Sequence, residues 1–211
     1  MKFYRKSGQL LSEINYKNGK RSGLAKDYYK NGKLHHEMYY EENLQHGEAK
    51  TFYESGSIHS ITPFFKGKIH GIEKKYRENG KLMSEMPYYM GLPAIGLKEY
   101  TSDGKLKKQY PEFKIELEDK ILLENAAIVK AYFTEPGHAE YYKGKLKEDK
   151  YLTDDNFKVS GKNGVLELKY SLPPGTFVME ELYITGVRKT HLGNYLVKHQ
   201  KYNLALENKG Y

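Results

Sequence analysis

The sequence predicts an all-β protein in which an elongated array of antiparallel β-hairpin repeats is followed by an immunoglobulin-like β-sandwich. The first observation is a set of glycines spaced 24 residues apart, namely Gly8, Gly32, Gly56, Gly80 and Gly104. A fixed period of this size indicates stacked copies of one supersecondary unit. The second observation is that the period ends near Pro111 and is followed by short apolar runs divided by turn signals. We therefore expect two domains, at residues 1–111 and 112–211.

Each unit of the array is expected to turn at its periodic glycine. Asn31-Gly32, Asn79-Gly80 and Asp103-Gly104 predict two-residue hairpins with a type I′ turn, which requires positive φ at both central residues. After the turn, residues two apart are expected to share one face of a strand, as in Leu34, His36, Met38 and Tyr40. A second turn is expected at Gly19, Asn43, Gly67 and Gly91.

Two aromatic positions also recur in every unit. Stacked units place equal positions in columns, so we expect two aromatic ladders to form the core, with each ring pair adding about 0.5 to 1.5 kcal/mol. The first ladder is Tyr4, Tyr28, Phe52, Tyr76 and Tyr100, and the second is Tyr16, Tyr40, Phe64 and Tyr88.

The unit resembles the bacterial variant of the MORN repeat. The matching positions are Tyr28 to Leu34, Glu37 and Tyr40, together with Tyr16, Asn18, Gly19 and Gly23. The resemblance covers residues 3–110 and implies a single-layered array of antiparallel hairpins. Members of this family are mostly interaction scaffolds; some look like antitoxin or immunity partners of bacterial toxins, and others are proposed to bind membrane lipids. Asn43, Pro63, Pro87 and Ile95 depart from the pattern, so we expect a distorted unit at 91–100.

The second half contains seven strand-like runs separated by turn signals. They are Phe113 to Leu117, Ala127 to Phe133, Ala139 to Leu146, Phe157 to Ser160, Val165 to Tyr170, Phe177 to Thr185 and Tyr195 to Leu204. Seven short strands in about 100 residues are typical of an immunoglobulin-like sandwich. With no cysteine and no tryptophan, the antibody-type version is excluded.

The formal charge of +8 lies on the repeats. Residues 1–111 hold 20 Lys and Arg against 12 Asp and Glu, and residues 112–211 hold 15 against 15. A basic surface attracts nucleic acid, anionic lipid or an acidic partner. Lysine greatly outnumbers arginine, which disfavours specific nucleic-acid recognition. There is no membrane-length apolar run and no signal peptide, so the chain is expected to be soluble. Its compartment stays open between the cytoplasm and export with a missing leader.

No set of residues predicts catalysis, a cofactor or a metal site. His35 and His59 share one repeat position, as do His46 and His70, but a zinc site needs three or four ligands. We therefore expect these histidines to face solvent. Glu13, Glu37 and Glu85 recur once per unit, which favours a structural role over paired catalytic carboxylates. We predict a protein that is not an enzyme.

The lysines Lys2, Lys26, Lys50, Lys74 and Lys98 occupy one repeat position on the face of the first aromatic ladder. We interpret their stems as cover for the rings; the alternative is a basic stripe for an anionic surface. The candidate binding residues are Tyr39, Tyr53 and Tyr89, expected to be exposed outside both ladders, with Lys26, Lys50 and Lys74.

Three functional hypotheses follow from these residues. The first is a non-enzymatic scaffold that binds an unidentified protein through the array, with an antitoxin- or immunity-type protein as its narrower form. The second is association with an anionic membrane or phospholipid through the basic repeats. The third is a cell-envelope hydrolase or a carbohydrate-binding accessory. Lys2 and Tyr4 already stand inside a unit, so we also expect further sequence before Met1.

Overall fold

The computed structural model describes residues 1–210 and consists of two compact units, Met1–Lys107 and Lys108–Tyr211. The expected boundary at Pro111 falls just after this division. Almost all regular structure is antiparallel strand, and the one helix in the described chain, α1 (Ile121–Glu124), is a single turn. The protein is therefore all-β, as the sequence predicts.

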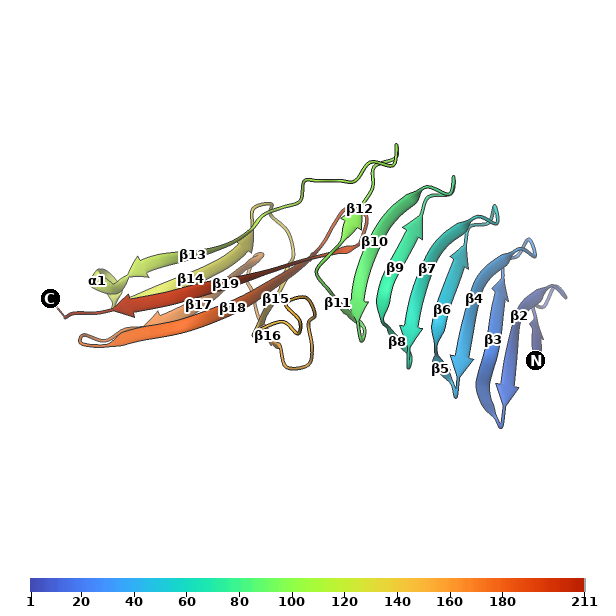
Figure 1. The fold of residues 1–211 in the computed structure, drawn as a ribbon, viewed down its shortest axis with the longest axis horizontal. Helices are drawn as coiled ribbons and strands as arrows, with labels where there is room; N and C mark the ends of the chain where they lie inside the picture. Colours follow the sequence, from blue (N-terminus) through green and yellow to red (C-terminus); the bar gives the residue numbers. More distant parts are fainter. Residues whose placement is uncertain (211) are drawn as a thin grey trace. The chain divides into compact units, whose positions relative to one another are not determined.

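The first unit is one antiparallel sheet, ordered β1-β2-β3-β4-β6-β7-β9-β10-β11, in which successive hairpins lie side by side (Figure 1). The short strands β5, β8 and β12 pair with β4, β7 and β10. The strands are β1 (Lys2–Tyr4), β2 (Leu10–Lys17), β3 (Lys20–Tyr28), β4 (Leu34–Glu41), β5 (Leu44–Gln45), β6 (Gly47–Phe52), β7 (Ile58–Phe65), β8 (Lys68–Ile69), β9 (Gly71–Tyr76), β10 (Leu82–Tyr89), β11 (Leu92–Pro93) and β12 (Lys98–Glu99).

The turn at the periodic glycine differs in type from the prediction. Gly32 and Gly80 have positive φ, at +81° and +79°, but Asn31 and Asn79 do not. The Gly32 N–H donates to the Tyr29 carbonyl, and the Tyr29 N–H donates to the Lys33 carbonyl. This is the three-residue loop in which a type I turn is followed by a left-handed glycine. The two-residue type I′ prediction is therefore wrong at this turn.

The type I′ geometry occurs instead at the second turn of each unit. Asn18 and Gly19 both have positive φ, at 52° and 76°, between the paired residues Lys17 and Lys20. The same double positive φ occurs at Glu42-Asn43, Lys66-Gly67 and Met90-Gly91. Two positive φ values in a two-residue loop define this turn.

A β-bulge follows the first turn of each of the first four units and changes the predicted alternation. Tyr28 pairs with Leu34 while Asp27 pairs with His36, so His35 is the extra residue. Leu34 consequently shares a face with Tyr28 and Glu37, and the prediction that it shares one with His36 is wrong. Equivalent bulges occur at Leu11, His59 and Met83.

The pairing register therefore defines two faces of the array. The Lys–Glu face carries the row Lys2, Glu13, Lys26, Glu37, Lys50, Ile61, Lys74, Glu85 and Lys98. The small-residue face carries buried side chains that include Ser12, Ala25, Ser60, Thr62, Ser84 and Met86.

The aromatic residues do not stack into ladders. Equal positions in successive units are two strands apart, about 9.5 Å, whereas ring pairs interact at centroid separations of about 4.5 to 7 Å. An aliphatic residue stands across from each ring of the first column: Leu10 pairs with Tyr4, Leu34 with Tyr28, Ile58 with Phe52, and Leu82 with Tyr76. The predicted ring-on-ring core is thus an alternating aromatic and aliphatic row.

The last unit of the array is distorted, as expected from Ile95. Only β11 and β12, of two residues each, stand where earlier units have a long strand. Tyr100 pairs with Leu106, and the Lys107 N–H donates to the Glu99 carbonyl. This short hairpin covers the edge of β12, where Glu99 is buried with its carboxylate 3.6 Å from Lys107 Nζ.

The second unit contains a three-stranded sheet, β13-β14-β17, and a four-stranded sheet, β16-β15-β18-β19. The strands are β13 (Phe113–Lys120), β14 (Ala126–Phe133), β15 (Glu140–Lys143), β16 (Phe157–Val159), β17 (Val165–Ser171), β18 (Phe177–Lys189) and β19 (Tyr195–Glu207). All seven predicted runs form strands. Their buried core includes Val129, Tyr141 and Ile184, which confirms a sandwich-like arrangement.

Candidate interaction surface

Lysine and glutamate alternate across the array on the Lys–Glu face. The lysines at the recurring position lie directly across from the recurring glutamates, because their strands are neighbours in the sheet. Lys2 Nζ lies 2.9 Å from Glu13, Lys26 Nζ lies 3.9 Å from Glu37, and Lys98 Nζ lies 3.6 Å from Glu85. Cross-strand pairs of opposite charge stabilise a sheet. The row is therefore partly neutralised.

Tyrosine hydroxyls of the adjacent aromatic row bind two of these glutamates, Glu13 and Glu85. Tyr28 donates to Glu13 at 2.9 Å, and Tyr100 donates to Glu85 at 2.8 Å. Hydrogen bonds from Lys2 and then Tyr28 lower the pKa of Glu13. Burial and the bond to Glu13 raise the pKa of Tyr28. The recurring glutamates thus have structural partners, which accounts for their presence in three units.

The row has one interruption, at Ile61. This residue takes the position filled by glutamate in the other units, directly across from Lys50 on one side and Lys74 on the other. Among the described residues, neither lysine has a carboxylate within 4.0 Å. The interruption therefore leaves one lysine on each side of an aliphatic side chain, and neither lysine is paired with a carboxylate of the described chain.

Large apolar side chains between residues 20 and 76 that are exposed all lie on the Lys–Glu face. Leu24 and Tyr39 pair with each other, and their exposed fractions are 39% and 44%. Leu44 is 49% exposed, Phe65 40% and Ile72 50%, and Ile58 is at 36%. On the small-residue face, this part of the array exposes no large apolar side chain among the described residues.

Histidines and aromatic rings form a chain of contacts at the second-turn end of this face. The Phe65 ring lies 5.4 Å from the His46 ring and 5.9 Å from the His70 ring, and the Tyr89 ring lies 5.2 Å from the His70 ring. This chain extends across three hairpins. It continues the apolar surface from Tyr39 toward β10.

Five of the six predicted binding residues come together on the Lys–Glu face. They are Lys26, Lys50, Lys74, Tyr39 and Tyr89. Tyr53 points to the other side of the sheet, where its ring lies 4.7 Å from the His59 ring. Of the three tyrosines, only Tyr39 is exposed; Tyr53 and Tyr89 are half-buried. The expected exposure is therefore wrong for those two.

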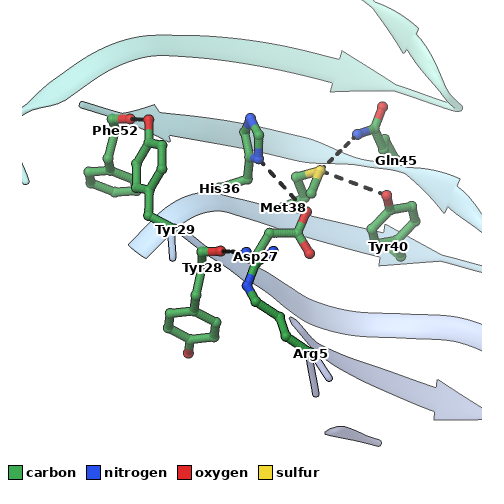
Figure 2. A network of polar contacts seen from close by, with 9 residues as sticks. All are labelled: Arg5, Asp27, Tyr28, Tyr29, His36, Met38, Tyr40, Gln45 and Phe52. Atoms are coloured by element: carbon green, nitrogen blue, oxygen red, sulfur yellow. Dashed lines mark hydrogen bonds and ion pairs between the residues drawn. The ribbon is translucent and has the colours of Figure 1, made fainter. Parts of the chain in front are cut away.

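Tyr53 belongs to a series of bonds that join successive units. The residue after the first aromatic position sends its side chain to a backbone carbonyl 23 residues on (Figure 2). Arg5 donates to the Tyr28 carbonyl at 2.7 Å and Tyr29 to the Phe52 carbonyl at 2.6 Å. In later units, Tyr53 donates to the Tyr76 carbonyl at 2.8 Å and Arg77 to the Tyr100 carbonyl at 2.8 Å. The recurrence of Arg or Tyr at this position was the available sequence signal.

Of the recurring histidines, His35 and His59 pack against Tyr29 and Tyr53. All four recurring histidines are half-buried, so they are less exposed to solvent than expected. The His35 ring lies 4.0 Å from the Tyr29 ring and 3.6 Å from the His36 ring. Burial lowers the pKa of both His35 and His59, with smaller contributions from His36 and Lys75 respectively. Within residues 1–210, no three His, Asp or Glu side chains gather into a group that could hold a metal ion.

Comparison with known families identifies the repeats. The MORN repeat variant matches four successive segments, residues 1–18, 21–42, 45–66 and 69–88. The match extends over no residue of the second unit. No curated protein matches the chain. Among the described residues, no helix is long and apolar enough to span a membrane.

Proposed function

From the four MORN repeat variants in residues 1–88, we propose that this protein is a non-enzymatic scaffold that binds a partner protein through the Lys–Glu face of its array. MORN repeats are a non-catalytic repeat type and commonly bind proteins or membranes. The proposal rests chiefly on one observation: between residues 20 and 76, the exposed large apolar side chains gather on the Lys–Glu face. Protein interfaces have this composition, with apolar and aromatic side chains at the centre and charged groups at the rim.

The apolar row varies between units while the scaffold positions repeat. One repeat position holds Asn15, Tyr39, Pro63 and Pro87, and another holds Leu24, Glu48 and Ile72, so the chemistry at both positions varies along the array. The glutamates and lysines of the neighbouring row recur almost unchanged. Variable side chains on a constant framework support recognition of one particular surface, since such a surface need not repeat.

A capture experiment tests this proposal in cells of the source organism. The bait variant replaces Tyr39, Phe65 and Ile72 by Ser. The control replaces Leu122, Leu123 and Phe177 by Ser, because these residues of the second unit are 88%, 90% and 72% exposed. We expect a partner on the wild type and the control, and its loss from the bait variant, because central apolar side chains carry most binding energy. Retention by the bait variant would refute the proposed surface.

An antitoxin- or immunity-type partner is the narrower form of the proposal. The supporting feature is the resemblance of the repeat to such proteins, and the test is genetic. A toxin encoded beside this gene should inhibit growth when expressed alone and lose that effect when this protein is co-expressed. Rescue by the control variant but not by the Tyr39, Phe65 and Ile72 variant would connect the activity to the Lys–Glu face.

Association with an anionic membrane is the second candidate, favoured by the excess of lysine on the array. Neutralisation of Lys2, Lys26 and Lys98 by neighbouring carboxylates argues against it. We expect weak binding to phosphatidylserine vesicles, unchanged when Lys26, Lys50 and Lys74 become Gln. Strong binding that falls steeply with salt and is abolished by the three substitutions would make the membrane the primary partner.

A further inference from the structure

The interruption of the charged row at Ile61 identifies the chemistry of the partner more closely. The row otherwise alternates Lys and Glu in every unit between β1 and β12. Glutamate is replaced only at this position, and the replacement is an aliphatic side chain that has no charge of its own. Lys50 and Lys74 remain on either side of it, on β6 and β9.

The carboxylates directly across the sheet from these two lysines are already engaged. Glu37, across from Lys50, forms its ion pair with Lys26 at 3.9 Å. Glu85, across from Lys74, forms its ion pair with Lys98 at 3.6 Å and accepts the Tyr100 hydroxyl. Along the two strands, the same-face neighbours are Glu48 and Phe52 beside Lys50 and Ile72 and Tyr76 beside Lys74. Glu48 is exposed and forms no ion pair with a described residue.

The spacing between the two lysines suits one acidic group. Their strands are separated by β7 alone, which places the two backbones about 9.5 Å apart. Lysine side chains are long enough to converge over the intervening Ile61. A carboxylate between them would occupy the place that Glu13, Glu37 and Glu85 occupy in other units.

We propose that the partner protein supplies this carboxylate, so that an Asp or Glu of the partner completes the row between Lys50 and Lys74. This inference rests on the proposed protein-binding function. The surroundings are mainly apolar, since Ile58, Phe65 and Ile72 are exposed on the same face, and Glu48 is the charged neighbour of Lys50 along β6. The partner segment is therefore acidic at one position and apolar on both sides of it.

Substitutions at position 61 give the sharpest test. Ile61→Glu supplies the missing carboxylate within the chain, and Ile61→Gln provides a side chain of similar size without the charge. The probe is a displayed library of random peptides, selected on the immobilised full chain. We expect the selected peptides to combine Asp or Glu with apolar residues, to bind Ile61→Gln, and to lose about tenfold or more in affinity on Ile61→Glu.

Lysine substitutions provide a charge-matched control. Lys50→Gln with Lys74→Gln should also weaken these peptides about tenfold or more, because two charge-assisted contacts are lost. Lys26→Gln with Lys98→Gln removes the same charge from lysines that already have partners, and should change affinity less than about threefold. Equal losses in both pairs would show a general charge effect and would refute the site.

The remaining outcomes separate this inference from the proposed function. Selection of peptides that lack acidic residues would refute the carboxylate site. So would peptides that bind Ile61→Glu as well as the wild type but do not bind the Tyr39, Phe65 and Ile72 variant; both results would leave the proposed binding face intact. Peptides that bind both of these variants as tightly as the wild type would refute the proposed binding face as well. A third outcome is that no peptide is selected, the wild type binds phosphatidylserine vesicles, and Ile61→Glu loses that binding. This result would overturn the proposal in favour of a lipid anion.

Discussion

Removing the tyrosine hydroxyls that join successive units should destabilise the array by a predictable amount. Tyr29 donates to the Phe52 carbonyl at 2.6 Å, and Tyr53 donates to the Tyr76 carbonyl at 2.8 Å. Phenylalanine keeps each ring and removes only the donor. The loss of one such bond costs about 1 kcal/mol of unfolding free energy. Each bond has its own donor and acceptor, so the sum for the double variant is about 2 kcal/mol; the Phe52 carbonyl adjoins Tyr53, so both single variants are measured as well to test additivity.

Tyr39→Phe is the matched control. The Tyr39 ring is 44% exposed, and its hydroxyl has no partner among the described residues. Its removal should change the unfolding free energy by less than about 0.5 kcal/mol. With a urea dependence of about 2 kcal/mol per molar, the double variant should unfold at a urea concentration about 1 M lower than the control.

Urea unfolding followed by circular dichroism measures the midpoint, and hydrogen exchange assigns it to residues 1–107. The second measurement is needed because the chain has two compact units, which can unfold separately. Peptides from β6 and β9 should lose protection in the double variant before those from the second unit. Equal midpoints for Tyr53→Phe and Tyr39→Phe would refute the claim that these hydroxyls hold units together.

Two further predictions concern the turn and the histidines. Gly80→Val should lower the unfolding free energy by more than about 1 kcal/mol, because φ is +79° and a β-branched residue adopts that conformation at high cost; Gly80→Asn should lose much less, and an unchanged melting temperature for the valine variant would contradict the assignment. The pKa values of His35 and His59 are lowered from 6.5 by burial, so the unfolded chain binds protons that the folded chain does not, and array stability should fall as the pH drops below 6.5. Replacing both histidines by Asn should flatten the dependence of melting temperature on pH, and an equally steep dependence in that variant would exclude them as its source.

The sequence was sufficient for the architecture because the repeats encode it several times. Each 24-residue period carries two turn signals, and all seven runs of the second half contain β-forming residues between Pro, Gly and Asn. Local signals of this kind decide where strands begin and end. They do not decide how many residues each loop contains. Asn31-Gly32 therefore predicted a type I′ turn, whereas the pairing of Tyr28 with Leu34 closes a longer loop.

The candidate surface was harder to predict because it depends on register. Lys26 and Glu37 are eleven residues apart, and only the pairing of β3 with β4 places them side by side. The bulge at His35 also moves Leu34 to the opposite face, which period-two alternation cannot anticipate. The position of the Tyr53 side chain was hard to predict for a related reason. Its acceptor is a backbone carbonyl in the next unit, and no side-chain pattern marks a carbonyl.

Repetition within the chain separates the residues that build the array from those available for recognition. Bonds that join units require a long side chain with a hydrogen-bond donor, as at Arg5, Tyr29, Tyr53 and Arg77. A position that changes from unit to unit is free of that requirement. Tyr39 and Ile72 are such positions, and Ile61 replaces the glutamate of a row that is otherwise regular. All three lie on one face, so the side chains that architecture does not constrain are those that a single partner surface can contact together.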